Sequence, residues 1–248
     1  MATNPRYLTT APARAEAIDV GLRRYMLRIY NYMAMGLAVS GLVAATVAFT
    51  SIGDIFFMRV VTATGQVGIA ATGLGWIAIF APLGILLLAM FTARRMSFAT
   101  LQFMYWAFVA VNGISLSILL MIYTGESVIQ VFFITSAAFA GLSLFGYTTK
   151  KNLSGVGSFL IMGVWGLLIV GIVNIFMQSA MMSFVFAAAG VLIFAGLTAY
   201  KTQELKLAYS ERLGSEAEGR LAIFGAWMLY ITFINLLQFL MYFMGNRQ

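Results

Sequence analysis

Long apolar runs, separated by short charged segments, set the pattern of this chain. Six runs contain no Asp, Glu, Lys or Arg: 29–53, 60–93, 96–125, 127–149, 152–200 and 221–246. A transmembrane helix needs about 20 apolar residues, so five of these runs accommodate one span each. The run 152–200 would extend about 74 Å as one helix, more than twice a hydrocarbon core. The polar residues Asn174, Gln178 and Ser179 predict a turn within it.

Seven spans follow from this pattern. We predict them near 29–49, 67–92, 98–123, 128–148, 153–177, 180–201 and 221–244. These segments are apolar on every face, whereas the strands of a membrane barrel alternate apolar and polar residues. A continuous helix also satisfies its own backbone hydrogen bonds in lipid. The prediction is an all-α membrane protein with one transmembrane domain over 29–248.

We predict that the N-terminal segment 1–28 is cytoplasmic and that part of it forms a short interfacial helix. Ile18, Leu22, Met26 and Ile29 fall on one helical face from Ala13 onward, a pattern typical of helices lying on a membrane. A solvated tail is the alternative interpretation. The segment has no apolar core or small-residue cleavage site of a signal peptide. The later hydrophilic segment 201–220 is a second candidate for the membrane surface.

Basic residues are distributed very unevenly between the two predicted sides. With the N-terminus in the cytoplasm, 13 of the 15 lie inside and only Arg59 and Arg247 lie outside. This asymmetry is what the positive-inside rule describes for a cytoplasmic N-terminus and an external C-terminus. The net charge of +7 is therefore a topology signal. It does not indicate a nucleic-acid site, because the basic residues are dispersed over several segments.

Composition argues against several kinds of chemistry. The chain has no His and no Cys, and none of its eight acidic residues lies inside a predicted span. A zinc site needs His, Cys or clustered carboxylates, and intramembrane proteases need a histidine base or two aspartates at depth. A retinal protein needs a mid-span lysine with an acidic counter-ion. We expect no catalytic residue, no metal site and no cofactor.

The remaining candidates are polar residues in the last two spans. Thr198, Lys201, Thr202 and Gln203 end the sixth span, and Thr232 and Asn235 lie on one face of the seventh with Gln238. Lys201 is the only ionisable side chain that adjoins a long apolar run within a helical pattern. These residues form a candidate gate or pore cluster. Ordinary interhelical hydrogen bonding, worth about 0.6 kcal/mol per contact, is the alternative interpretation.

Several sequence blocks resemble a known membrane protein family. They are GYTTKKNLS at 146–154, GSFLIMGVWGLLIVGIVNIF at 157–176, FAGLTAYKTQELK at 194–206 and GAWMLYITFINLLQFLMYFMGNR at 225–247. Together they are similar to bacterial members of the Bax inhibitor-1 family, within the TMBIM superfamily. The resemblance implies six helices around a central seventh. For some relatives it also implies a pH-sensitive calcium leak and a role in stress or cell death.

Three positions depart from the family pattern. Relatives typically read GYTTKxDLS, TAYDTQ and LYLDFINLF, and this chain has Asn152, Lys201 and Thr232 in place of the three aspartates. The motif positions that match are Gly146, Tyr147, Thr148, Thr149 and Lys150. The resemblance implies that the last two aspartates form a pair that shares a proton and gates the pore. Two carboxyl groups in such a pair repel each other when both are ionised, so one of them keeps its proton to a higher pH. A lysine and a threonine cannot reproduce that mechanism.

An ammonium at this position repels a divalent cation instead of attracting it. One hypothesis is that Lys201 closes the pore and bonds to Thr232, Asn235 or backbone carbonyls. The alternative is that Lys201 extends to the cytoplasmic surface and pairs with Glu204 at the i,i+3 spacing.

We therefore expect a multi-pass inner-membrane protein that is channel-like or regulatory, with an impaired or closed calcium leak. The alternative function is a non-conducting protein that binds and regulates other membrane proteins. The expected partners are the lipid bilayer and, under the alternative, other membrane proteins. Calcium binding is not expected, and nucleic-acid binding is not expected.

Overall fold

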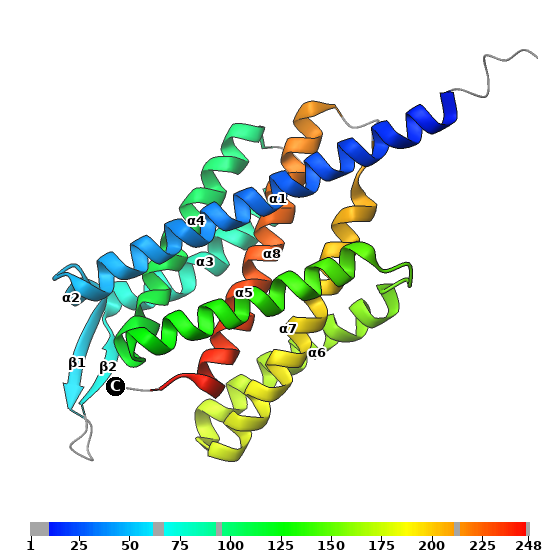
Figure 1. The fold of residues 1–248 in the computed structure, drawn as a ribbon. Coiled ribbons are helices and arrows are strands. Elements are labelled where there is room, and N and C mark those ends of the chain that lie inside the picture. Colours follow the sequence, from blue (N-terminus) through cyan, green and yellow to red (C-terminus); the bar gives the residue numbers. More distant parts are fainter. Residues whose placement is uncertain (1–9, 62–66, 93–95, 211–213, 247–248) are drawn as a thin grey trace, which may run out of the picture.

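A computed structural model of the chain describes residues 10–61, 67–92, 96–210 and 214–246. Within these ranges, seven helices are long and apolar enough to cross a membrane. They are α1 Thr10–Phe49, α3 Gly73–Thr92, α4 Phe98–Ile122, α5 Gly125–Thr148, α6 Ser154–Met177, α7 Ala180–Ala208 and α8 Ser215–Met244. Figure 1 shows them as one bundle of steeply crossing helices. The predicted all-α, seven-span architecture is confirmed.

The last helix, α8, lies at the centre of the bundle. Of its most apolar stretch, 61% of the residues are buried, against 11–33% in the other six helices. α1, α4, α5 and α7 pack directly on α8, whereas α3 packs mainly on α4 and α6 mainly on α7. The predicted central seventh helix is therefore present, and two of the six surrounding helices form an outer layer.

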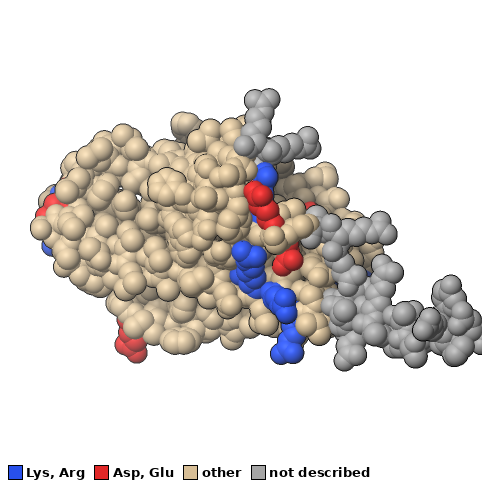
Figure 2. All heavy atoms as spheres, turned by 90° about the horizontal axis from the view of Figure 1, so that it is seen from above, with Lys and Arg blue, Asp and Glu red and all other residues tan. Residues whose placement is uncertain are grey.

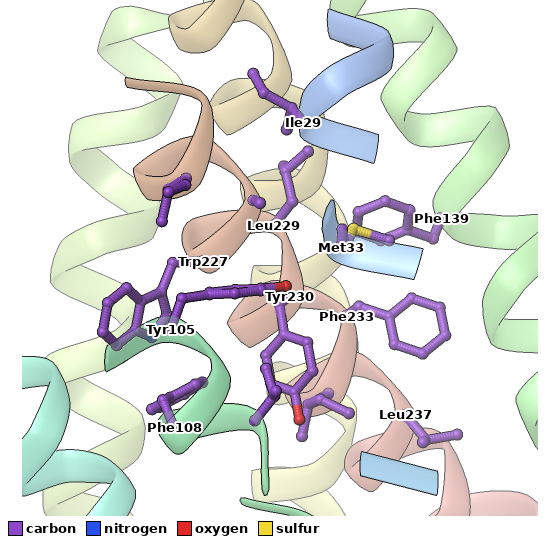
Figure 3. Close-up of a cluster of buried hydrophobic side chains, with 14 of the residues drawn as sticks. Ile29, Met33, Tyr105, Phe108, Phe139, Trp227, Leu229, Tyr230, Phe233 and Leu237 are labelled. Atoms are coloured by element: carbon purple, nitrogen blue, oxygen red, sulfur yellow. The ribbon is translucent and has the colours of Figure 1, made fainter. Parts of the chain in front are cut away.

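Aromatic side chains fill the space between α8 and its neighbours (Figure 3). The Trp227 ring lies 5.0 Å from Phe108 and 5.9 Å from Tyr105, centroid to centroid, and Tyr230 lies 5.6 Å from Phe108. Lipid is as apolar as these rings, so close packing and interhelical hydrogen bonds, rather than escape from water, hold such helices together. The Tyr230 hydroxyl supplies one such bond, because it lies 2.6 Å from Oγ of Ser40 on α1.

The predicted turn inside the run 152–200 is present. α6 ends at Met177, and Gln178 takes the left-handed conformation with φ 47°. Asn174 Oδ1 accepts a hydrogen bond from the Ser179 backbone N–H at 3.2 Å. The Ser179 side chain then caps α7 by accepting from the Met182 N–H. The three polar residues thus satisfy backbone groups at the helix ends, where no intrahelical partner exists.

The predicted interfacial helix before the first span is not a separate element. α1 runs without a break from Thr10 to Phe49. Leu22, Met26 and Ile29 are buried in the main core cluster. Their apolar stripe therefore faces other helices of the bundle, and not a membrane surface. Ile18, the fourth residue of that stripe, lies outside the residues whose side chains are described.

A β-hairpin replaces the first part of the predicted second span. A short helix, α2 Gly53–Phe56, leads into strand β1 Phe57–Val61, which pairs antiparallel with β2 Val67–Ala71. The run 60–93 is long enough for both a strand and a 20-residue helix, and its first part is rich in Val, Thr and Gly, which favour strands and turns over helices. The membrane helix begins only at Gly73.

The hydrophilic segment 201–220 is also helical over most of its length. α7 continues to Ala208, and α8 begins at Ser215. Leu205, predicted on a membrane surface, is buried with the core cluster. The sixth span is thus about 10 Å longer than predicted, at 1.5 Å per residue.

Candidate functional site

Most charged residues gather at one end of the bundle. Figure 2 shows a broad uncharged surface with Lys, Arg and acidic side chains mainly toward one side. This end, here called the basic end, carries Arg23, Arg24, Lys150, Lys151, Lys201, Lys206 and Arg220. Contacts between helices support the grouping, since Lys206 Nζ donates to the Tyr147 carbonyl at 2.7 Å and the Tyr209 and Tyr25 rings lie 5.5 Å apart. Lys201, Thr202 and Gln203 of the candidate polar cluster lie near this end, whereas Thr232 and Asn235 lie in the second half of α8.

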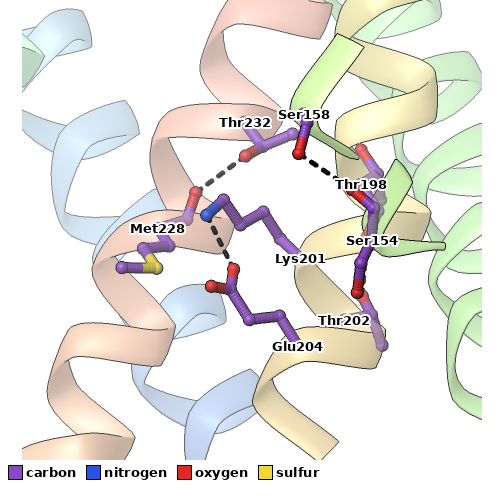
Figure 4. A network of polar contacts seen from close by, with 8 residues as sticks. All are labelled: Ser154, Ser158, Thr198, Lys201, Thr202, Glu204, Met228 and Thr232. Carbon is purple, nitrogen blue, oxygen red and sulfur yellow. Dashed lines mark hydrogen bonds and ion pairs between the residues drawn. The ribbon is translucent and has the colours of Figure 1, made fainter. Parts of the chain in front are cut away.

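Lys201 lies two turns before the C-terminal end of α7 and forms an ion pair. Its ammonium is 2.7 Å from Glu204 Oε2, and the side chains are 20% and 44% exposed. This is the i,i+3 pair that the spacing predicts as one of two alternatives. Figure 4 shows the Lys201 side chain extending from α7 toward the α8 turn that carries Met228 and Thr232. The site therefore holds a half-exposed salt bridge, of a kind that contributes little to stability.

The neighbouring hydroxyl and amide groups mostly bond to their own helices. Thr198, Thr202 and Thr232 are buried and donate to the carbonyls of Phe194, Thr198 and Met228, each at 2.8 Å. Asn235 Nδ2 donates to the Ile231 carbonyl at 2.8 Å. Thr232 and Asn235 are thus satisfied within α8, and no bond joins them to Lys201 among the described residues.

Gln203 has a different role, because it ties the α5–α6 connection to α7. Its Oε1 accepts from the Leu153 backbone N–H and its Nε2 donates to the Lys151 carbonyl, both at 2.8 Å. The side chain is 6% exposed. One amide therefore satisfies both a donor and an acceptor of a segment that has no regular secondary structure.

We expect Gln203→Met to destabilise the protein by about 1 kcal/mol, because it removes the partner of the half-buried Leu153 backbone N–H and of the Lys151 carbonyl. The apparent melting temperature in detergent should fall by several degrees. Gln238→Met, at an exposed position on α8, is the matched control and should melt like the wild type. Equal melting of the two variants would contradict the role of Gln203.

The motif GYTTKKN, residues 146–152, lies against the last turns of α7. A Cβ atom on Gly146 would collide with the Ala199 backbone carbonyl oxygen, so α5 and α7 cross here at backbone contact. The remaining motif side chains serve local structure. Thr148 donates to the Leu144 carbonyl, Thr149 accepts from the Lys151 N–H, and Asn152 accepts from the Ser154 N–H at the start of α6. Lys150 is exposed.

One part of this site is absent from the sequence prediction. Ser143 Oγ on α5 lies 2.9 Å from Thr202 Oγ1 and 2.5 Å from the Tyr30 hydroxyl on α1. Three helices are thereby linked through hydroxyl groups just below the basic end. The three residues are far apart in the sequence, and only a tyrosine within a charge-free run hinted at a polar contact.

The described residues contain no group of three or more His, Cys, Asp or Glu that could hold a metal ion. The cluster offers hydroxyl and amide groups, and its one carboxylate, Glu204, is already paired with Lys201. Such an arrangement fixes helices relative to one another and places one partly exposed cation beside α8. It offers no free carboxylate to a divalent ion.

Comparison with known proteins identifies the family. The family model described as inhibitor of apoptosis-promoting Bax1 matches residues 22–248. An uncharacterized protein of Caulobacter vibrioides is 48% identical over 99% of this chain and 98% of its own length. The uncharacterized protein RP147 of Rickettsia prowazekii is 40% identical over 96% of both chains. Inner membrane protein YbhL of Escherichia coli K12 is 31% identical over 92% of this chain and 94% of its own.

These matches agree with the fold. The chain has seven helices suited to membrane crossing in its described part, and one relative is named as an inner membrane protein. The protein is therefore a multi-pass protein of the bacterial inner membrane. Because the family model matches residues 22–248, almost the whole of this chain, the chain belongs to the Bax inhibitor-1 family.

Proposed function

We propose that this protein is a channel-like or regulatory member of the family in which the calcium leak is closed. The observation that carries the proposal is that neither Lys201 nor Thr232 offers a free carboxylate, although Lys201 pairs with Glu204 on its own helix and not with Thr232 or Asn235. The resemblance to the family assigns an aspartate to position 201 and a second one to position 232. Here the first position holds an ammonium and the second a hydroxyl bonded to its own helix.

Electrostatics explains why this arrangement opposes a divalent cation. A unit charge facing a calcium ion at short range is worth several kcal/mol, even at an effective dielectric constant of about 20. A pair of aspartates would attract the ion. The Lys201–Glu204 pair has no net charge, and its carboxylate is already bonded to the ammonium. Calcium entering at this point would give up its hydration without gaining a ligand.

The proposal also gives the orientation of the bundle in the membrane and assigns the protein no catalytic activity. The basic end faces the cytoplasm, as the positive-inside rule requires, and the C-terminus lies at the opposite end. There Asn246 bonds to Thr124 and Ser127 at the α4–α5 connection, through its backbone carbonyl and N–H. The candidate cluster has no nucleophile paired with a general base, so conduction or regulation, rather than catalysis, fits its residues.

Calcium entry into dye-loaded liposomes containing the wild-type protein tests this proposal. We expect the rate between pH 5.5 and pH 8 to equal that of protein-free liposomes, because the ion finds no free carboxylate. The fluorescent dye reports entry after calcium is added outside, and an ionophore added at the end confirms that the dye responds. A protein-dependent rate that changes with pH would contradict the closed state.

A further inference from the structure

An apolar groove runs along the outside of the bundle between α1 and α5. Its volume is about 910 Å³, and α8 contributes Phe233 to its lining. α1 and α5 both pack on α8 but not extensively on each other, which leaves the groove between them. Its lining extends from Arg23 to Gly41 on α1 and from Phe132 to Tyr147 on α5.

The groove is charged at one end only. Arg23 is the one charged residue among the described lining residues, and it lies at the basic end with Tyr147. Toward the other end the lining is formed by residues such as Leu37, Gly41 and Phe132. This is the distribution of a site for an amphiphile with an anionic head.

Arg23 is available to bind an anion. It is exposed, and no ion pair joins it to any described residue. Lys206 adds a second positive charge close by, because its ammonium bonds to the Tyr147 carbonyl and lies 5.2 Å from the centroid of that ring. A guanidinium binds phosphate oxygens through paired N–H donors.

The length of the groove fits the acyl chains of one membrane leaflet. The α5 lining spans about 22 Å at 1.5 Å per residue, longer than the roughly 15 Å that one leaflet of a 30 Å hydrocarbon core requires.

We propose that this groove binds an anionic phospholipid, with its acyl chains along α1 and α5 and its phosphate at Arg23. Basic pockets between transmembrane helices are known recognition sites for such headgroups. The hydroxyl chain Tyr30–Ser143–Thr202 joins the wall of the groove to the helix that carries Lys201. A bound lipid would thereby contact side chains that are hydrogen-bonded to α7, the helix that carries Lys201.

Native mass spectrometry of the full-length protein in detergent tests the proposal. The probes are phosphatidylglycerol and phosphatidylcholine with identical acyl chains. We expect wild type to bind phosphatidylglycerol more tightly. Arg23→Gln should weaken that binding about fivefold, since a basic residue near an anionic lipid surface contributes about 1 kcal/mol, and should leave phosphatidylcholine binding unchanged. Arg24→Gln is the matched control, because Arg24 does not line the groove.

A second pair of variants tests the groove itself. Ala140→Phe places a ring inside it, and Ala137→Phe places the same ring at an exposed position of α5 outside the lining. Only the first should reduce binding of both lipids. Equal binding of the two lipids by wild type, or equal weakening by Arg23→Gln and Arg24→Gln, would overturn the proposal. An Ala140→Phe variant that binds both lipids as tightly as wild type would also overturn it.

Discussion

Replacing Gly146 by alanine is expected to lower the apparent melting temperature by about 10 °C, corresponding to a loss of about 3 kcal/mol for a chain of this size. The added Cβ would collide with the Ala199 backbone carbonyl oxygen, and its next nearest atoms are the carbonyl carbon and Cα of the same residue. Backbone cannot move aside as a flexible side chain can. α5 and α7 would have to separate, and overpacking of this kind costs about 1–3 kcal/mol or more.

Separation of these helices would also disturb the contacts beside Gly146. The Ser143–Thr202 bond and the Gln203 bonds to the 151–153 segment both cross from α7 to α5 or its connection. Their lengths of 2.8–2.9 Å leave little room for a shift before the bonds weaken. The steric clash and the weakened hydrogen bonds would therefore both destabilise the crossing of α5 and α7.

Gly141→Ala is the control for this experiment. Gly141 lies on the same helix, and a Cβ atom there meets nothing within 4 Å. Alanine is favoured over glycine in a helix by about 0.8–1 kcal/mol, so this variant should melt at or slightly above the wild-type temperature. Thermal size-exclusion chromatography in detergent gives both values. Similar melting of the two variants would mean that close α5–α7 contact at Gly146 does not stabilise the fold.

The number of spans was predictable because hydropathy and length report directly on membrane crossing. The α6–α7 turn was predictable too, since Asn174, Gln178 and Ser179 are polar residues inside an apolar run. The hairpin over 57–71 was missed because a short strand such as Val67–Ala71 is as apolar as the helix that follows it. The end of α7 was misplaced since the charges after Lys201 suggested a surface segment.

The candidate site was predictable only where its contacts are local. The Lys201–Glu204 pair follows from an i,i+3 spacing on one helix. The Tyr30–Ser143 contact joins residues 113 positions apart, and the Gln203 bonds join residues about 50 apart. Such contacts depend on how the helices cross, which the pattern of apolar residues does not specify. Two glycines of α6 illustrate the same point, because a Cβ atom on Gly163 would lie 2.9 Å from Ile193 Cδ1, whereas one on Gly166 would meet no atom within 4 Å.

The double change Lys201→Asp with Thr232→Asp is expected to produce a calcium leak. It removes the ammonium, frees the site from the existing ion pair with Glu204, and places carboxylates on the facing helices α7 and α8. Changing the sign of the nearby charge alters the energy of a divalent ion by several kcal/mol. Since 1.4 kcal/mol is a factor of ten, calcium entry should rise more than about tenfold over wild type.

The rate of the double aspartate variant should also depend on pH. Two carboxylates this close do not both ionise readily, so their charge changes over a range where isolated aspartates are already ionised. The double asparagine variant, Lys201→Asn with Thr232→Asn, has nearly the same shape and no charge. It should therefore show how much of any leak comes from loss of the lysine alone.

Calcium entry into dye-loaded liposomes containing wild type, the double aspartate variant and the double asparagine variant tests the central claim most directly. Equal protein incorporation and a single symmetric peak in size-exclusion chromatography are required of all three. The closed-leak account predicts a silent wild type, a pH-dependent leak in the aspartate variant alone, and little or no leak in the asparagine variant. A folded aspartate variant as silent as wild type, or a leak of equal size in both variants, would contradict it.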